Sequence, residues 1–222
     1  VQTCALPISL DRAIDRTLLR YLGAPRGDRI YLTAKLHSDP VVQQLARLEP
    51  PLGEVLDVAC GRGQLSILLV ELGLATRFTG LDWDRRKVEV CQVAAGEDGR
   101  AIVADATRAE LAPVDTVLII DALHYLAREE RRALLERAAA ALRPGGRLVI
   151  RELDPKRGLR SRIAQWAERV GSRVGMNRGA VCEWVDPAAL SAEVAALGLS
   201  PRLVPHPDDK PSPNYLLIAD KA

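Results

Sequence analysis

The sequence predicts an α/β fold with a doubly wound, mostly parallel sheet. Short apolar runs alternate with helical patterns from residue 54 to residue 152, and repeated strand–helix units of this kind form parallel sheets with right-handed crossovers. Two further apolar runs near the C-terminus have no helix between them, which predicts an antiparallel hairpin. With 222 residues, 48% of them hydrophobic, the chain is long enough to bury a sizeable core.

Three helices are predicted ahead of the sheet. Apolar side chains recur at helical spacing in residues 10–22, and a second helical pattern covers residues 28–36. Asp39 is expected to cap a third helix, which has Pro40 at its first position and runs to about residue 48. We therefore expect an N-terminal helical cap at residues 10–52 and the main domain at residues 53–222. Residues 1–9, VQTCALPIS, resemble a translated sequencing adapter and are expected to be a non-native or disordered leader.

Five strands and the helices between them follow in order. Strands are expected at residues 54–58, 77–81, 101–104, 115–120 and 147–152, with helices at 64–72, 84–95 and 128–142. Gly73 suits the C-cap of the first of these helices. The Pro144-Gly145-Gly146 segment is expected to turn the chain into the fifth strand.

The C-terminal part departs from this alternation. Residues 156–185 are expected to be a basic helical insert, because residues 156–178 contain Lys156 and six arginines but only one acid. A helix is predicted at residues 186–198, where Asp186-Pro187 begins it. The hairpin strands are expected at residues 201–204 and 215–219.

Composition excludes several classes of protein. The net charge of only +2 argues against a general nucleic-acid binder, which has a strong basic bias. The four cysteines have neither the spacing of a zinc site nor that of a disulfide framework, so we expect no metal and a reducing, cytoplasmic location. No apolar run approaches the length of a transmembrane segment.

A strand, a glycine turn and a helix follow one another at EVLDVACGRGQ, residues 54–64. Gly61 and Gly63 let the backbone approach a ligand closely, and the N-terminus of the following helix offers free N–H groups. This layout is typical of nucleotide-type ligand sites at the carboxyl ends of parallel strands.

The ligand class is narrowed by acids that recur at the ends of four predicted strands. Their positions are Asp57, Asp82, Asp105 and Asp121. Carboxylates accept hydrogen bonds from hydroxyls and amines, and an acid after the second strand suits ribose hydroxyls. A ligand with a ribose, an exocyclic amine and an ammonium group, but no phosphate, fits this set. S-adenosylmethionine is such a ligand.

A dinucleotide is the rival ligand. It would need a G-x-G-x-x-G pattern at the start of the helix, whereas here the glycines stop at Gly63 and Leu65 and Ser66 follow. An NAD(P)-dependent oxidoreductase is therefore kept only as a weaker alternative.

Four motifs in order resemble those of class I S-adenosylmethionine-dependent methyltransferases. They are VLDVACGRGQ, LDWD, VADAT and TVLIIDALHYL, followed by LRPGGRLVIRELDP, and the resemblance covers residues 54 to about 155. It implies a three-layer, Rossmann-like sheet of seven strands with one antiparallel strand in the C-terminal hairpin. Gln64 departs from the pattern, since many members have a third glycine or a threonine there.

The resemblance also implies the roles of individual residues. Asp57 would lie near the methionine amino group, with backbone contacts from Ala59, Gly61 and Gly63. Asp82 would accept from the ribose hydroxyls, and Trp83 would pack near the adenine. Asp105, with Ala106 beside it, would accept from the adenine amine, and Asp121 would lie near the methionine end and face the acceptor.

The methyl acceptor is less well defined by the sequence. His124 follows the fourth strand and is the candidate general base for a hydroxyl acceptor; the alternative is that it shapes the pocket or caps a helix. YLTAKLHSDPVVQQL faintly resembles methyltransferases of bacterial aryl-polyene and polyketide-type biosynthesis. That resemblance implies a small-molecule or carrier-protein-bound acceptor, an aromatic or acyl intermediate, and the basic insert would suit an acidic carrier.

A methyltransferase fold without activity, serving as a binding subunit, is the second functional class. The four acids argue against it, because a decayed site would not need them. Methylation of nucleic acid has no support, since no NPPY-like motif follows the fourth strand.

Overall fold

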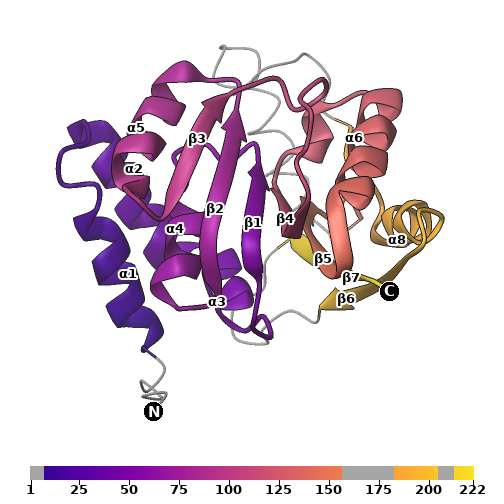
Figure 1. The fold of residues 1–222 in the computed structure, drawn as a ribbon, viewed down its shortest axis with the longest axis horizontal. Coiled ribbons are helices and arrows are strands. Elements are labelled where there is room, and N and C mark those ends of the chain that lie inside the picture. The colour runs from indigo at the N-terminus through magenta and orange to yellow at the C-terminus, as the bar shows by residue number, and fades with distance from the viewer. Residues whose placement is uncertain (1–7, 157–182, 205–212) are drawn as a thin grey trace. The chain divides into compact units, whose positions relative to one another are not determined.

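The predicted fold class is confirmed by a computed structural model of the chain, which describes residues 8–156, 183–204 and 213–222 (Figure 1). Seven strands make a mixed sheet that is parallel except at one strand of the C-terminal hairpin. The chain divides into two compact units, residues 1–104 and 105–222. Residues 1–7 and the predicted helix of the basic insert fall outside the described residues.

The first unit is built on three parallel strands in the order β3-β2-β1. They are β1 (Gly53–Val58), β2 (Ala75–Asp82) and β3 (Gly99–Val103), and their register aligns Asp57 with Gly80 and Asp82 with Val103. The helices α4 (Gln64–Glu71) and α5 (Arg85–Ala95) connect the strands and pack against them. The β1 strand is buried over its last four residues, as expected of a strand covered on both faces.

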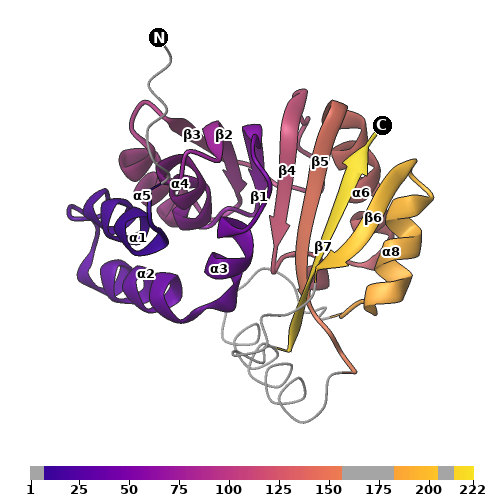
Figure 2. The same ribbon diagram turned by 90° about the horizontal axis from the view of Figure 1, so that it is seen from below.

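Three helices precede the first strand. These are α1 (Leu10–Leu19), α2 (Arg26–Ser38) and α3 (Pro40–Ala46), and Figure 2 shows α4 between α1 and the strands. Asp39 accepts a hydrogen bond from the Val41 backbone N–H at 3.0 Å, so its predicted capping role is confirmed. Glu71 at the end of α4 pairs with Arg16 and Arg20 of the α1 region, which holds α1 against α4.

The second unit carries the strands β4-β5-β7-β6 in that order. The β4 strand (Val114–Ile120) pairs in parallel with β5 (Leu142–Leu153), whereas β7 (Asn214–Lys221) runs antiparallel to both β5 and β6 (Leu199–Val204). A short 3-10 helix, η1 (Leu123–Tyr125), follows β4. The helices α6 (Arg128–Ala141) and α8 (Pro187–Ala195) pack on this group of strands.

Several predicted boundaries are wrong by a few residues. The first helix ends at Leu19 instead of residue 22, because the backbone from Arg20 to Ala24 forms successive turns. The fifth strand begins at Leu142, before the predicted Pro-Gly-Gly turn. Val114 pairs with Leu142 and Thr116 with Arg147, so the intervening residues form a bulge within the strand.

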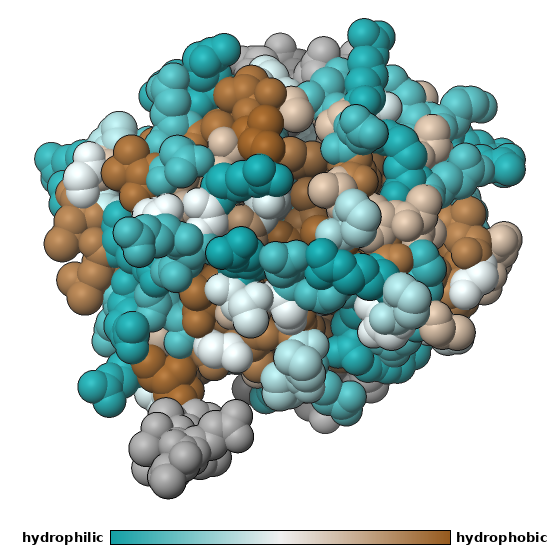
Figure 3. All heavy atoms as spheres, viewed as in Figure 1, coloured by the Kyte–Doolittle hydropathy of each residue, from teal (hydrophilic) through white to brown (hydrophobic). Residues whose placement is uncertain are grey.

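Each unit has its own buried apolar core. The fully buried side chains include Ile67, Leu68 and Leu69 in the first unit and Leu118, Ile119 and Leu123 in the second. Hydrophilic and hydrophobic side chains are interspersed on the face drawn in Figure 3, with brown side chains at its left edge, where Figure 1 places α1. Among the described residues, no helix is both long and apolar enough to cross a membrane.

Candidate functional site

The glycine turn between β1 and α4 is the centre of the candidate site in the first unit. Three residues of the turn have positive φ angles: Ala59 at 61°, Gly61 at 58° and Gly63 at 74°. A Cβ atom on Gly63 would lie 2.3 Å from the Cys91 sulfur, so a larger residue at this position would require Cys91 of α5 to shift. A Cβ atom on Gly61 would meet no protein atom within 4 Å, and this side of the turn is therefore open.

Asp82, the last residue of β2, holds the turn from the sheet side. Its Oδ2 atom accepts a hydrogen bond from the Gly61 N–H at 2.8 Å, and its Oδ1 atom accepts one from the Asp84 N–H at 2.9 Å. A carboxylate oxygen can accept two hydrogen bonds, so each oxygen retains capacity for one more donor. The structure thus brings together two predicted site residues, Gly61 and Asp82.

Asp57 is buried in β1, with 4% of its surface exposed. Burial raises the pKa of its carboxyl from 3.8 to about 7, the hydrogen bond from Ser66 lowers it, and the nearby Asp82 charge raises it. The Ser66 hydroxyl donates to Asp57 Oδ2 over 2.6 Å. A carboxyl with this pKa is protonated in part at neutral pH, and a nearby cation would favour its charged form.

Trp83 stands out next to these buried acids because 42% of its surface is exposed. A large aromatic side chain directly after β2 offers a flat apolar surface for a ring. Together, the turn, the two acids and Trp83 collect six of the predicted cofactor residues in the first unit: Asp57, Ala59, Gly61, Gly63, Asp82 and Trp83.

Asp105 and Ala106 begin the second unit, shortly after β3. The Asp105 Oδ1 atom accepts hydrogen bonds from the Thr107 N–H at 3.0 Å and from the Thr107 hydroxyl at 2.7 Å. The Ala106 carbonyl accepts from an Arg137 guanidinium N–H at 2.8 Å. These contacts connect the loop to α6 through Arg137, and Asp105 acts as a local turn residue.

Asp121 directly follows β4 and has a positive φ angle of 55°. Its carboxylate forms an ion pair with Arg151 of β5, whose side chain is 5% exposed, and its backbone N–H donates to the Arg151 carbonyl at 2.9 Å. Asn214 of β7 also contacts this pair. The sequence predicted Asp121 but missed its partner, because that pairing depends on strand order.

His124 forms a buried pair with Glu152, the penultimate residue of β5. The His124 Nδ1 atom lies 2.7 Å from Glu152 Oε2, and both side chains are at most 5% exposed. Glu152 Oε1 accepts from the backbone N–H groups of Ala122 at 3.0 Å and Leu123 at 2.6 Å. Glu152 therefore connects the imidazole to the start of η1 and fixes both.

Aromatic side chains enclose the His124 ring. Tyr125 lies with its ring centroid 4.0 Å away at a tilt of 48°, and Trp184 stacks at 6.0 Å with an interplanar angle of 13°. Such surroundings have a low dielectric constant, which strengthens the hydrogen bond to Glu152. Glu152 was not among the residues predicted from the sequence, although it too is an acid at the end of a strand, like the four acids that were predicted.

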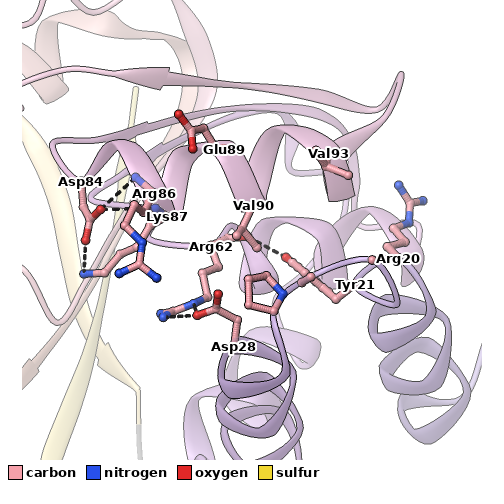
Figure 4. Close-up of a pocket in the computed structure, with 13 residues that line it drawn as sticks. Arg20, Tyr21, Asp28, Arg62, Asp84, Arg86, Lys87, Glu89, Val90 and Val93 are labelled. Atoms are coloured by element: carbon pink, nitrogen blue, oxygen red, sulfur yellow. Dashed lines mark hydrogen bonds and ion pairs between the residues drawn. The ribbon is translucent and has the colours of Figure 1, made fainter.

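A pocket of about 330 Å³ adjoins the glycine turn in the first unit (Figure 4). It lies between the α1–α2 connection, Arg62 of the turn and α5. None of the predicted cofactor residues is among the described residues that line it. Cationic and acidic side chains both line the pocket, so the lining shows no preference for one sign of ligand charge. The charged residues are Arg20, Arg62, Arg86, Lys87, Asp28, Asp84 and Glu89.

Comparisons with known proteins agree with the motifs. A family model described as "Methyltransferase domain" matches residues 55–146. The "Ubiquinone biosynthesis O-methyltransferase" of Xanthomonas axonopodis pv. citri (strain 306) is 27% identical over 160 residues, which cover 69% of this chain and 65% of that protein. The "Phthiotriol/phenolphthiotriol dimycocerosates methyltransferase 1" of Mycobacterium ulcerans (strain Agy99) is 32% identical over 122 residues, covering 53% of this chain and 43% of that protein.

The fold has solved counterparts as well. The crystal structure of an S-adenosylmethionine-dependent methyltransferase from Mesorhizobium loti matches with a TM-score of 0.66 at 17% identity, covering 83% of this chain and 99% of that one. The chain spans less than two thirds of the length of either curated relative. The residues matched by the family model contain the four motifs and agree with the predicted methyltransferase family, and the solved structure supports the predicted fold.

Proposed function

We propose that this chain, a class I S-adenosylmethionine-dependent methyltransferase by its domain match and fold, transfers a methyl group to a hydroxyl oxygen of a small or carrier-bound acceptor. When bound, S-adenosylmethionine supplies an electrophilic methyl group on a sulfonium centre. The single observation that carries the oxygen acceptor is the buried His124–Glu152 pair, because removal of a hydroxyl proton is the step for which a base is useful.

The first unit has the groups that such a donor requires. Gly61 leaves an open side to the turn, where backbone and ligand can approach each other. Both Asp82 oxygens keep a lone pair for the ribose hydroxyls. Asp57 would become fully charged beside the methionine ammonium, and Trp83 would cover the adenine.

The second unit would supply the remaining donor contacts. We assign Asp105 and Ala106 to the adenine amine, as the family motifs imply. Asp121 is assigned to the methionine end, and its pairing with Arg151 supports this position for it by holding the carboxylate in one orientation. The ordered loops around Asp105 and Asp121 support these roles, which stay predictions until a ligand complex is solved.

His124 is proposed to take the hydroxyl proton at Nε2. A carboxylate can only accept hydrogen bonds, so Nδ1 donates to Glu152 and the lone pair of the neutral imidazole is on Nε2. Glu152 then stabilises the imidazolium that forms. The remaining rate enhancement is expected from proximity and orientation of the acceptor.

The acceptor class is proposed from two sources. The name of the Xanthomonas relative specifies an oxygen acceptor, and the name of the Mycobacterium relative specifies phthiotriol and phenolphthiotriol compounds. Both names agree with the expected acceptor, which is either an aromatic compound or a polyketide or acyl intermediate. Association with an acidic carrier protein depends on the basic insert, residues 156–185, most of which lies outside the described residues.

The domain assignment is likewise a proposal. We assign residues 10–52 to a helical cap and residues 53–222 to the methyltransferase domain with its basic insert. The contacts of Tyr21, between α1 and α2, and of Asp28, in α2, with Arg62 of the glycine turn support the first assignment. A cytoplasmic location remains a prediction from cysteine usage.

Cofactor binding is tested by calorimetry with S-adenosylmethionine. Asp82→Ala removes two acceptors for the ribose and releases the Gly61 N–H, so we expect Kd to rise at least about tenfold. Glu97→Ala, which removes an exposed carboxylate from the same unit, is the matched control and should bind like the wild type. A wild-type chain that binds no S-adenosylmethionine would end the proposal.

The acceptor is identified by a screen that detects S-adenosylhomocysteine. Phenolic acids, hydroxylated acyl chains and their carrier-bound forms are offered in parallel with matched amines. The proposed base is supported if the wild type turns over hydroxyl compounds and His124→Ala does not, while the Kd for S-adenosylmethionine stays unchanged. Equal turnover of amines would contradict an oxygen-directed site.

A further inference from the structure

Arg62 lies between the two glycines of the turn and is held by the α1–α2 region. Its Nε atom donates to Asp28 Oδ1 at 2.7 Å, and its Nη2 atom lies 2.5 Å from the same oxygen. The guanidinium carbon is 4.7 Å from the centre of the Tyr31 ring. Tyr21 donates its hydroxyl to the Arg62 carbonyl at 2.7 Å. Figure 4 shows Asp28 and Arg62 facing each other beside the pocket.

The contacts of Arg62 with Tyr21 and Asp28 are largely shielded from solvent, whereas Tyr31 is 44% exposed. Tyr21 is 2% exposed, and burial raises the pKa of its hydroxyl well above 10, so the hydroxyl stays a donor. The side chains of Asp28 and Arg62 are 13% and 21% exposed. Asp28 lies in the first turn of α2, where the helix dipole favours a negative charge. Charge-assisted hydrogen bonds in such surroundings are stronger than those on an open surface.

The turn is therefore held from two sides. Asp82 accepts from the Gly61 N–H on the sheet side, while Tyr21 donates to the next carbonyl, that of Arg62, on the helical side. The backbone at and next to these two groups has positive φ angles at Gly61 and Gly63, which the free chain would populate only in part. Holding such a turn in its binding conformation removes an entropic cost from ligand binding.

We propose that Asp28, Tyr21 and Tyr31 are positioning residues for the methyl donor: through Arg62 they hold the glycine turn in the conformation that binds it. This inference rests on the proposed function, because it takes the turn as the donor site. None of the three residues is assigned a contact with the donor. Their effect is predicted to appear in cofactor affinity and not in the chemical step.

Asp28→Asn is the first test, with Glu97→Gln as the matched control for loss of one carboxylate charge. Asp28→Asn keeps the shape of the side chain but removes the charge that holds Arg62. We expect the Kd for S-adenosylmethionine to rise about fivefold or more, with kcat at saturating donor unchanged. Asp28→Glu should restore part of the affinity, and the control should bind as the wild type does.

A double-mutant cycle shows whether the effect runs through Arg62. If it does, Asp28→Ala combined with Arg62→Ala should weaken binding no more than the worse single variant. Amide hydrogen exchange at residues 59–64 in the absence of ligand should accelerate in Asp28→Asn while the exchange of β2 stays slow.

The inference would be overturned if a folded Asp28→Asn variant bound S-adenosylmethionine with the wild-type Kd and exchanged the amide hydrogens of residues 59–64 at the wild-type rate. Additive losses in the cycle would also overturn it, because Asp28 would then act independently of Arg62. Failure of the wild type to bind S-adenosylmethionine would instead count against the proposed function. The exchange measurement would still decide whether Asp28 holds the turn.

Discussion

At the scale of single residues, the site depends on carboxyl groups whose surroundings differ. Asp82 accepts two backbone hydrogen bonds, Glu152 accepts two as well as the His124 contact, and Asp57 has one hydroxyl donor in a buried strand. The pKa of Asp57 is consequently raised to about 7, mainly by burial. The same chemical group, a carboxyl, thus supplies a turn anchor, an orienting partner and a titratable buried group.

Asp57 should make stability fall as pH rises. Its pKa is 3.8 when the chain is unfolded and about 7 when folded, so the contribution of the protonated carboxyl is complete below pH 4 and is lost as pH rises through about 7. Wild-type stability minus that of Asp57→Asn should decline by at most about 1.4 kcal/mol per pH unit between pH 4 and 7. Urea unfolding at a series of pH values measures this difference. A constant difference across that range would contradict the raised pKa.

Glu152→Gln should separate orientation of His124 from packing. The amide oxygen can accept from the Ala122 and Leu123 N–H groups, leaving the amide NH₂ to donate to His124 Nδ1. The imidazole would then carry its proton on Nε2 and could not act as a base. We expect kcat to fall about 10²- to 10⁴-fold with little change in Tm, while nitrogen NMR reports the changed tautomer.

His124 is also well packed, so the opposite result is informative. A Glu152→Gln variant that loses several degrees of Tm but keeps its kcat would assign the pair to the packing of η1 on β5. Tyr125→Phe is a suitable control, because it keeps the aromatic ring beside His124 and leaves Glu152 in place.

At the scale of elements, the β1–turn–α4 segment combines backbone strain with close packing. Gly63 and Gly73 both have positive φ angles, 74° and 71°, but their surroundings differ. A Cβ atom would overlap the Cys91 sulfur at Gly63 and would meet no protein atom within 4 Å at Gly73. Alanine at Gly73 therefore reports the cost of the backbone conformation alone, whereas alanine at Gly63 reports that cost together with the cost of overlap.

Gly63→Ala should destabilise the fold more than Gly73→Ala does. Gly73→Ala carries only the conformational strain of about 1–2 kcal/mol. Gly63→Ala adds an overlap with α5 that costs typically about 1–3 kcal/mol more. Chemical denaturation gives both values, and Cys91→Ala in the Gly63→Ala background should recover part of the loss. Equal losses in the two alanine variants would show that the overlap is relieved by movement of α5.

At the scale of the whole molecule, the chain folds as two compact units, and the motifs are distributed over both. The glycine turn, Asp57, Asp82 and Trp83 belong to the first, and Asp105, Asp121 and His124 to the second. A net charge of +2 gives no long-range preference for an anionic partner. Ligand-dependent stability is therefore the more direct measure of what the whole chain binds.

S-adenosylhomocysteine, the product of the proposed reaction, should stabilise the chain against heat. At 100 times Kd a ligand adds about 2.7 kcal/mol, and for a chain of this size each kcal/mol corresponds to roughly 2–4 °C. We expect a rise in Tm of about 5–10 °C by scanning calorimetry. NAD⁺ at the same concentration should leave Tm unchanged, because G-x-G-x-x-G is incomplete after Gly63. A shift with NAD⁺ alone would revive the oxidoreductase alternative.

The sequence by itself determined the order of strands and helices, the antiparallel hairpin, the glycine turn and the acids at strand ends. These follow from local rules, namely apolar periodicity, capping by Asp39 and the conformational freedom of Gly61 and Gly63. Boundaries were less well predicted where long-range pairing decided them, as at Leu142, which joins β5 only through its pairing with Val114.

Only the tertiary structure decided which charged side chains meet. The partners Asp121–Arg151, His124–Glu152 and Asp28–Arg62 are each separated by at least 28 residues in the chain. No local pattern encodes such a pair, because strand order and helix packing bring its members together. The raised pKa of Asp57 has the same origin, since burial by neighbouring elements is its main cause.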